Sequence, residues 1–150
     1  MKHTFFALAV LASSALPGFA QDMITKTSPH SVAQTMDRLQ AAVEGAGATV
    51  FARVDHAAGA AKVEMDLRPT QLLIFGNPKL GTPVIQADQA AGLDLPMRVL
   101  VHEAADGSVQ VSYHAPASLS EDHSVPAETP VLKMMTGALG KLTDKAVATE

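Results

Sequence analysis

Two stretches of this chain carry apolar residues at helical spacing, and five shorter runs have the composition of strands. The first stretch, residues 31–45, has an apolar side chain every three or four positions, as in a helix that buries one face. These positions are Val32, Met36, Leu39 and Val43. Ser31 and Gln34 form a capping box at its start. The second stretch, residues 128–146, repeats this spacing with Leu132, Met135, Leu139 and Leu142. The pattern therefore predicts two amphipathic helices.

The strand-like runs fill the rest of the pattern, and they lie at residues 23–27, 49–55, 70–75, 95–103 and 108–114. The run at 70–75 is continuously apolar in its centre, which predicts a strand buried on both faces. Asp106-Gly107 separates the last two runs and predicts a tight hairpin. The Ala-rich segment 56–64 is compatible with either a short helix or a loop.

Strands in series, flanked by helices, are typical of an α+β fold. We expect a mostly antiparallel sheet of about five strands, packed by two main helices in the order β-α-β-β-β-β-α. Residues 21–150 suit a single domain with one core. The segment 116–130 is a polar connection that contains prolines.

The first twenty residues have the features of a signal peptide. Lys2 supplies a positive start, residues 5–11 are apolar, and Pro17-Gly18 ends the apolar run. Small residues before position 21 predict cleavage after Ala20. The apolar run is shorter than the roughly 20 residues that span a bilayer. We therefore expect a periplasmic or secreted protein with no membrane span in the mature chain.

The composition excludes several classes of function. The chain has 11 Lys and Arg against 15 Asp and Glu, a formal net charge of −4, and no basic stripe, which argues against a nucleic-acid partner. It has no Cys, which excludes thiol nucleophiles, Cys-ligated metals and disulfides. The histidines His30, His102, His114 and His123 do not show metal-ligand spacing. We expect no metal and no cofactor.

Turn-forming and polar residues gather in residues 76–83 and 93–96. This crowding predicts a shaped loop on a rigid scaffold. After the loop, residues 82–91 are expected to form a short helix with Pro83 at its first position.

Several of these segments resemble the DUF302 family. The segments are Ser31-Val32, Thr35, Arg38-Leu39, residues 51–60, residues 67–70, Gly76-Asn77-Pro78-Lys79, Gly81-Thr82-Pro83 and Leu93-Asp94-Leu95-Pro96. The resemblance covers about residues 24–123. It implies a β-α-β4-α fold of the TATA-binding-protein-like type, which agrees with the order above. The family has no assigned biochemical function, so the resemblance implies no activity.

Five residues are candidates for a binding site, and each also has a structural explanation. Asp55 and His56 could form an acid–base pair or a metal ligand set. Neighbours on a strand point to opposite faces, however, which favours a His56 that caps the next turn or hydrogen-bonds the segment 76–83. Asn77 and Lys79 could hold an anion, or Asn77 could satisfy loop backbone groups as an Asx-turn. Asp94 lies between leucines, so we expect it to have either a raised pKa or a cationic partner, for which the candidates are Arg53, Arg68 and Lys79. Tyr113 could reach the same cluster or pack at a strand end.

Three functions remain open on the sequence alone. The first is a non-enzymatic module that binds a small ligand or a partner protein, with the polar cluster lining its groove. The second is a hydrolase or isomerase that uses Asp94 and His56 as acid and base. The third is a purely structural subunit whose motifs hold the fold and the dimer. We expect a homodimer in each case, because the strands are rich in leucine and the C-terminal helix carries methionines. No residue is assigned a catalytic role, because the sequence lacks a nucleophile motif.

Overall fold

The computed structural model describes residues 23–149, so the predicted signal peptide (1–20) and the predicted new N-terminus at Gln21 lie outside the described residues. The strands are β1 (Met23–Ser28), β2 (Thr49–Asp55), β3 (Thr70–Gly76), β4 (Met97–Glu103) and β5 (Val109–His114). The α-helices are α1 (Val32–Gly45), α2 (His56–Ala61), α3 (Pro78–Ala87), α4 (Leu119–Asp122) and α5 (Pro130–Val147). Two 3₁₀ turns, η1 (Gln89–Leu93) and η2 (Pro116–Ser118), complete the described chain.

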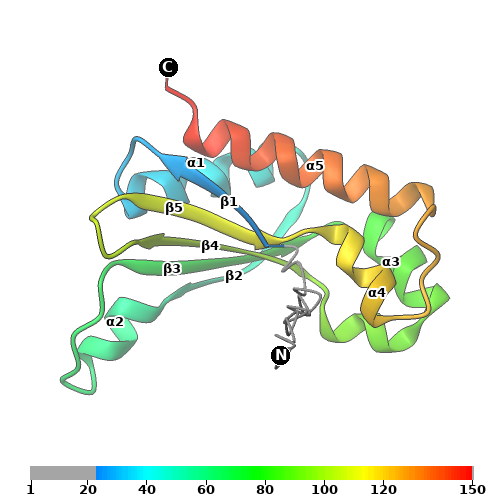
Figure 1. Ribbon diagram of the computed structural model, residues 1–150, viewed down its shortest axis with the longest axis horizontal. Coiled ribbons are helices and arrows are strands. Elements are labelled where there is room, and N and C mark those ends of the chain that lie inside the picture. The colour runs from blue at the N-terminus through cyan, green and yellow to red at the C-terminus, as the bar shows by residue number, and fades with distance from the viewer. Residues whose placement is uncertain (1–22, 150) are drawn as a thin grey trace, which may run out of the picture.

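The strands form one antiparallel sheet in the order β1-β5-β4-β3-β2. The long helices α1 and α5 lie side by side over one face of it (Figure 1). The predicted α+β fold with five antiparallel strands is confirmed. None of the helices in residues 23–149 is long and apolar enough to cross a bilayer.

The local signals at the first helix and the hairpin are borne out. Ser31 caps α1 and accepts a hydrogen bond from the Gln34 N–H, while the Gln34 side chain accepts one from the Ser31 N–H. In the β4–β5 hairpin, the Ala104 N–H donates to the Ser108 carbonyl at 2.8 Å. Gly107 takes a positive φ of 82°, which a residue without a Cβ adopts freely.

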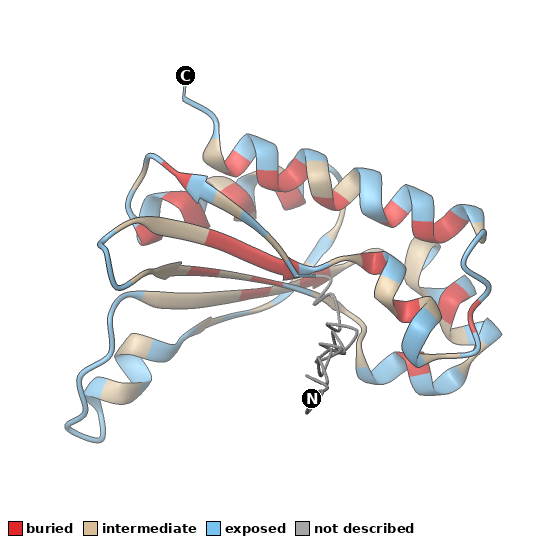
Figure 2. Cartoon of the chain, viewed as in Figure 1, coloured by how far each residue is buried: buried red, intermediate tan, exposed pale blue. Residues whose placement is uncertain are grey.

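The main core lies between the sheet and the two long helices (Figure 2). Side chains from β3, β4 and β5 meet the apolar faces of α1 and α5; they include Leu73, Val99, Val101, Val111, Met36, Leu39 and Leu139. A second cluster joins α3, η1, α4 and the start of α5: Val84, Ala91, Leu119, Val125, Val131, Leu132 and Met135.

Three local predictions differ from the structure. Residues 76–83 do not form a loop, because α3 starts at Pro78 and contains Pro83 in its interior. The strand β3 is not buried on both faces, since none of the helices in residues 23–149 covers its second face: Leu73 and Phe75 are buried, while Leu72 and Ile74 are half-buried. The connection 116–130 is not only polar, because η2 and α4 lie in it and Leu119 and Val125 enter the second cluster.

Candidate functional site

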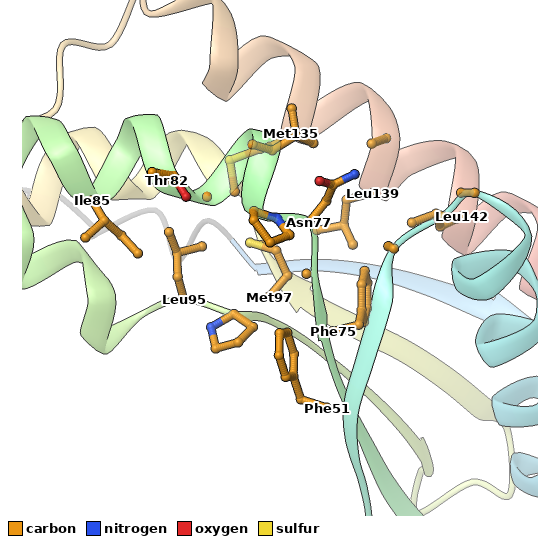
Figure 3. A pocket seen from close by; sticks show the side chains of 18 residues that line it. Phe51, Phe75, Asn77, Thr82, Ile85, Leu95, Met97, Met135, Leu139 and Leu142 are labelled. Atoms are coloured by element: carbon orange, nitrogen blue, oxygen red, sulfur yellow. The ribbon is translucent and has the colours of Figure 1, made fainter.

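The most distinctive hollow in the described chain is an apolar cavity of about 330 Å³ at one end of the sheet. It lies where β3 ends and β4 begins, beneath α3 and the middle of α5 (Figure 3). We call it the apolar cavity, and its larger lining side chains are Phe51, Phe75, Leu80, Ile85, Leu95, Met97, Met135, Leu139 and Leu142. Asn77 and Thr82 are the polar side chains among its described lining residues.

Local backbone features bring the walls together. The pairing of β2 with β3 shifts between Val50 and Ala52, which is a bulge that gives Phe51 no partner in the ladder. Phe51 turns to the cavity and is 58% exposed. A Cβ on Gly76 would stand 3.4 Å from the Pro96 Cβ and 3.5 Å from the Phe51 ring. Gly76 therefore lies between the two walls, at ordinary van der Waals distance from both.

Asn77 is the predicted site residue that lines this cavity. Its Oδ1 accepts a hydrogen bond from the Lys79 N–H at 2.9 Å, and Asn77 is the N-cap of α3. Its carbonyl oxygen also accepts hydrogen bonds from the N–H groups of Leu80 and Gly81. The Asx-turn interpretation of Asn77 is thus the one that the geometry supports. Lys79 is exposed in the first turn of α3 and does not line the cavity.

Asn77→Ala is expected to lower the free energy of unfolding by about 1 kcal/mol, because an N-cap side chain satisfies an otherwise unpaired helix N–H. Urea denaturation followed by circular dichroism measures this change. Asn77→Asp is the control, since aspartate keeps the capping oxygen, and it should retain most of the stability. An equal loss in both variants would contradict the capping role.

Asp94 lies in a second, more polar hollow of about 290 Å³, between the start of β4 and α4. Its Oδ2 shares a hydrogen bond of 2.7 Å with His123 Nε2, and its Oδ1 lies 3.4 Å from Arg98 Nη2. None of the expected partners Arg53, Arg68 and Lys79 pairs with it. The His123 side chain is only 8% exposed.

The carboxylate of Asp88 connects two segments close to His123 by hydrogen bonds. Asp88 Oδ2 accepts from the Ser124 N–H at 2.9 Å, and Asp88 Oδ1 accepts from the Ala90 N–H at 2.9 Å. These backbone hydrogen bonds, that of Ser124 first, lower the pKa of Asp88. Asp88 therefore joins η1 to the connection that follows α4.

His56 lies at the opposite end of the sheet from Asp94. It begins α2, directly after Asp55, and Asp55 pairs with Gln71 near the start of β3. Asn77 and Asp94 flank the other end, where Phe75 pairs with Met97. About five residues of strand, roughly 17 Å, separate the two ends. His56 is exposed, and the cap of α2 is Asp55, whose Oδ1 accepts from the Ala58 N–H at 2.8 Å.

Tyr113 is in neither hollow. It is 5% exposed and belongs to the main core, with Lys26 Nζ 6.0 Å from the centre of its ring. The five candidate residues are thus spread over separate places. The acid–base pair of Asp94 with His56 does not form in this structure, and the side chain beside Asp94 is His123.

The sequence profile of the family named "Domain of unknown function DUF302" matches residues 24–142. This chain belongs to the DUF302 family. A solved structure, an uncharacterised conserved DUF302 protein from Bacillus stearothermophilus, superposes with a TM-score of 0.75 at 19% sequence identity. The superposition covers 85% of this chain and 99% of that chain. This DUF302 member therefore has the fold of that protein.

The curated relatives are longer proteins from Brucella. "Fluoride-specific ion channel FluC 1" of Brucella suis biovar 1 (strain 1330) is 42% identical over 125 residues, which cover 83% of this chain and 49% of the relative. "Fluoride-specific ion channel FluC 2" of Brucella melitensis biotype 1 has the same identity over 46% of its length. The DUF302 chain spans about half the length of the curated relatives it matches.

Proposed function

We propose that this DUF302 domain is a non-enzymatic module that binds a small, uncharged, apolar molecule in the apolar cavity. The observation that carries the proposal is the lining of the cavity, in which aromatic, aliphatic and methionine side chains surround about 330 Å³ of space. Cavities of this size and composition are typical of small-molecule sites. Two polar side chains at the wall, Asn77 and Thr82, could orient one polar group of a ligand.

The cavity does not suit a small anion. An ion such as fluoride loses its hydration when it is buried and needs hydrogen-bond donors or a cation in exchange. The described lining offers only the neutral donors of Asn77 and Thr82, and Lys79 is not part of it. The fluoride channel activity in the names of the Brucella proteins belongs to chains about twice as long as the matched part. We therefore propose an apolar ligand for this domain rather than fluoride.

The proposal includes a location in the periplasm or outside the cell, and the signal-peptide features of residues 1–20 support it. A chain without cysteine has no thiols that an oxidising compartment could convert to disulfides. The ligand would then be an apolar molecule encountered outside the cytoplasm.

The test is a titration with the neutral fluorescent probe N-phenyl-1-naphthylamine. The unaltered protein is expected to bind it saturably at one site, and Ala138→Phe is expected to weaken binding at least about tenfold, or 1.4 kcal/mol. Ala138 lines the cavity from α5, so a phenyl ring there takes up ligand space. Ala41→Phe is the matched control, because Ala41 is exposed on α1 and is not a lining residue.

Three results would contradict the proposal. Unsaturable probe binding indicates simple partitioning and favours a purely structural subunit. Equal affinities for the protein with Ala138→Phe and with Ala41→Phe place the probe elsewhere. A saturable rise of the melting temperature with sodium fluoride, without a rise with sodium chloride, favours an anion site instead. The melting temperature of each variant shows whether it is folded.

A further inference from the structure

Asn77 contributes an amide to the wall of the apolar cavity, and the orientation of that amide is fixed. The oxygen and the nitrogen of an asparagine side chain are similar in size, so their hydrogen bonds decide which atom is which. The Lys79 N–H donates to the Asn77 side chain at 2.9 Å, and only the oxygen can accept this hydrogen bond. The other end of the amide, Nδ2, is therefore the end that is left for further contacts.

Asn77 Nδ2 has no hydrogen-bond acceptor among residues 23–149. It is also not enclosed by protein, because His102 Nδ1 is the only enclosed side-chain polar atom without a partner in that part of the chain. Asn77 is half-buried, and Figure 3 shows its amide, with the nitrogen in blue, among the side chains that line the cavity. The amide thus presents two N–H donors beside a mainly apolar space.

The first turn of α3 has no backbone donor left for an anion. Helix N-termini often bind anions through N–H groups that lack partners within the helix. Pro78 has no N–H, and the Lys79 N–H donates to the Asn77 side chain. The N–H groups of Leu80 and Gly81 donate to the Asn77 carbonyl, each at 2.9 Å. The described lining also contains no lysine, arginine or histidine, so a carboxylate or phosphate would lose its hydration there without a charged partner.

Thr82 has the other polar side chain of the described lining, and it is exposed. Water competes for the hydroxyl of an exposed residue, whereas a donor beside an apolar space forms a stronger hydrogen bond. The half-buried amide of Asn77 is therefore the better placed of the two donors. An amide donor of this kind matches a neutral acceptor, of which the carbonyl oxygen is the simplest.

We propose that the ligand of the apolar cavity is a neutral carbonyl compound, such as an aromatic ketone or ester, whose oxygen accepts a hydrogen bond from Asn77 Nδ2. This inference rests on the proposed function, because it names the chemical class of the ligand for the same cavity. The carbonyl group pairs with the amide donor without bringing a charge into the cavity. The apolar part of the ligand contacts the Phe51 and Phe75 rings and the Met135 thioether, which suit an aromatic ring. Asn77 then has two roles, since its Oδ1 caps α3 and its Nδ2 selects the ligand.

The test compares 2-acetylnaphthalene with 2-ethylnaphthalene, which has a methylene group in place of the carbonyl. Each compound competes with N-phenyl-1-naphthylamine for the cavity, and the ratio of the two affinities isolates the contact with the carbonyl oxygen. Asn77→Asp keeps the capping oxygen and removes both N–H donors. This variant is expected to lower the affinity for 2-acetylnaphthalene relative to 2-ethylnaphthalene at least about fivefold, the effect of one lost hydrogen bond.

Two further variants separate the donor from the added charge. Gln86→Glu is the matched control, because it makes the same amide-to-carboxylate change at an exposed residue of α3 that does not line the cavity. It should leave the ratio unchanged within about twofold. Asn77→Ser keeps a capping oxygen without adding a charge, and it should lower the ratio as Asn77→Asp does. The melting temperature shows whether each variant is folded.

Four results would overturn this inference. An unchanged ratio in Asn77→Asp, while N-phenyl-1-naphthylamine still binds saturably, would overturn it and leave the proposed function in place. A fall in Asn77→Asp that is absent in Asn77→Ser, or that is equal in Gln86→Glu, would show an effect of charge alone. A larger fall in Thr82→Val than in Asn77→Asp would assign the carbonyl contact to Thr82. Unsaturable binding of N-phenyl-1-naphthylamine would contradict the proposed function itself, and this inference with it.

Discussion

Replacing Leu73 by alanine is expected to lower the free energy of unfolding by about 3 kcal/mol, within the range of about 2–5 kcal/mol for buried leucines. Leu73 is 0% exposed in the centre of β3 and pairs with Val99. It lies beneath α1 in the main core, between neighbouring strands, where the backbone cannot move in to fill the space. Since a domain of this size is stable by roughly 5–15 kcal/mol, this single change removes a large share.

Leu93→Ala is the matched control for this prediction. It is the same substitution, but Leu93 is 82% exposed at the end of η1. We expect the free energy of unfolding to change by less than about 0.5 kcal/mol. Urea denaturation of both variants, with equal slopes, measures the difference. Similar losses at the two positions would contradict the prediction. Two small losses would mean that neighbouring side chains fill the space left by Leu73, and two large losses would mean that Leu93 is covered in solution.

The fold could be predicted from the sequence because its signals are local. The spacing of Met36, Leu39 and Val43 marks the buried face of α1, and the capping box at Ser31 marks its start. Asp106-Gly107 locates the hairpin because few residues adopt the positive φ of Gly107. Each of these features depends on residues close together in the chain.

The predicted start of α3 differs from the observed one for a physical reason. Proline is common in the first turn of a helix, so the sequence predicts a helix that starts near Pro83 and a loop over residues 76–83. In the structure Pro78 has that position, with Asn77 as the cap, and Pro83 lies inside α3 without an N–H for the helical hydrogen bond. The sequence offers two prolines that fit the same role, and the surroundings of α3 decide between them.

The candidate site could not be predicted in the same way. Helical spacing predicts that Met135 and Leu139 face the interior of the protein. It does not predict whether they pack against other side chains or line a cavity. Phe51 reaches the cavity through a bulge that pairing with β3 creates. His123 meets Asp94 across 29 positions of sequence. These relations arise only when distant segments pack together.

Lys26→Met is expected to lower the free energy of unfolding by about 2 kcal/mol, because hydrogen bonds from a charged group stabilise by roughly 1.5–3 kcal/mol. Lys26 Nζ lies 2.6 Å from Asp144 Oδ1, 2.7 Å from Thr143 Oγ1 and 3.0 Å from the Gly140 carbonyl. Its side chain is 23% exposed, so water screens these contacts only in part. Methionine keeps most of the volume of the side chain and removes the charge.

Lys133→Met separates this effect from the general loss of a surface lysine. Lys133 Nζ lies 2.6 Å from Glu128 Oε2, at the same distance as in the Lys26 pair, but both side chains are mostly exposed, at 66% and 87%. An exposed pair contributes roughly 0–1 kcal/mol, so this change should be small.

The Lys26 contacts join the edge strand β1 to the half of α5 that follows the cavity-lining residues Met135 and Leu139. Lys26→Met should therefore also weaken probe binding in the apolar cavity, whereas Lys133→Met should not. Equal stabilities and equal probe affinities for the two variants would mean that apolar packing alone holds α5 over the sheet.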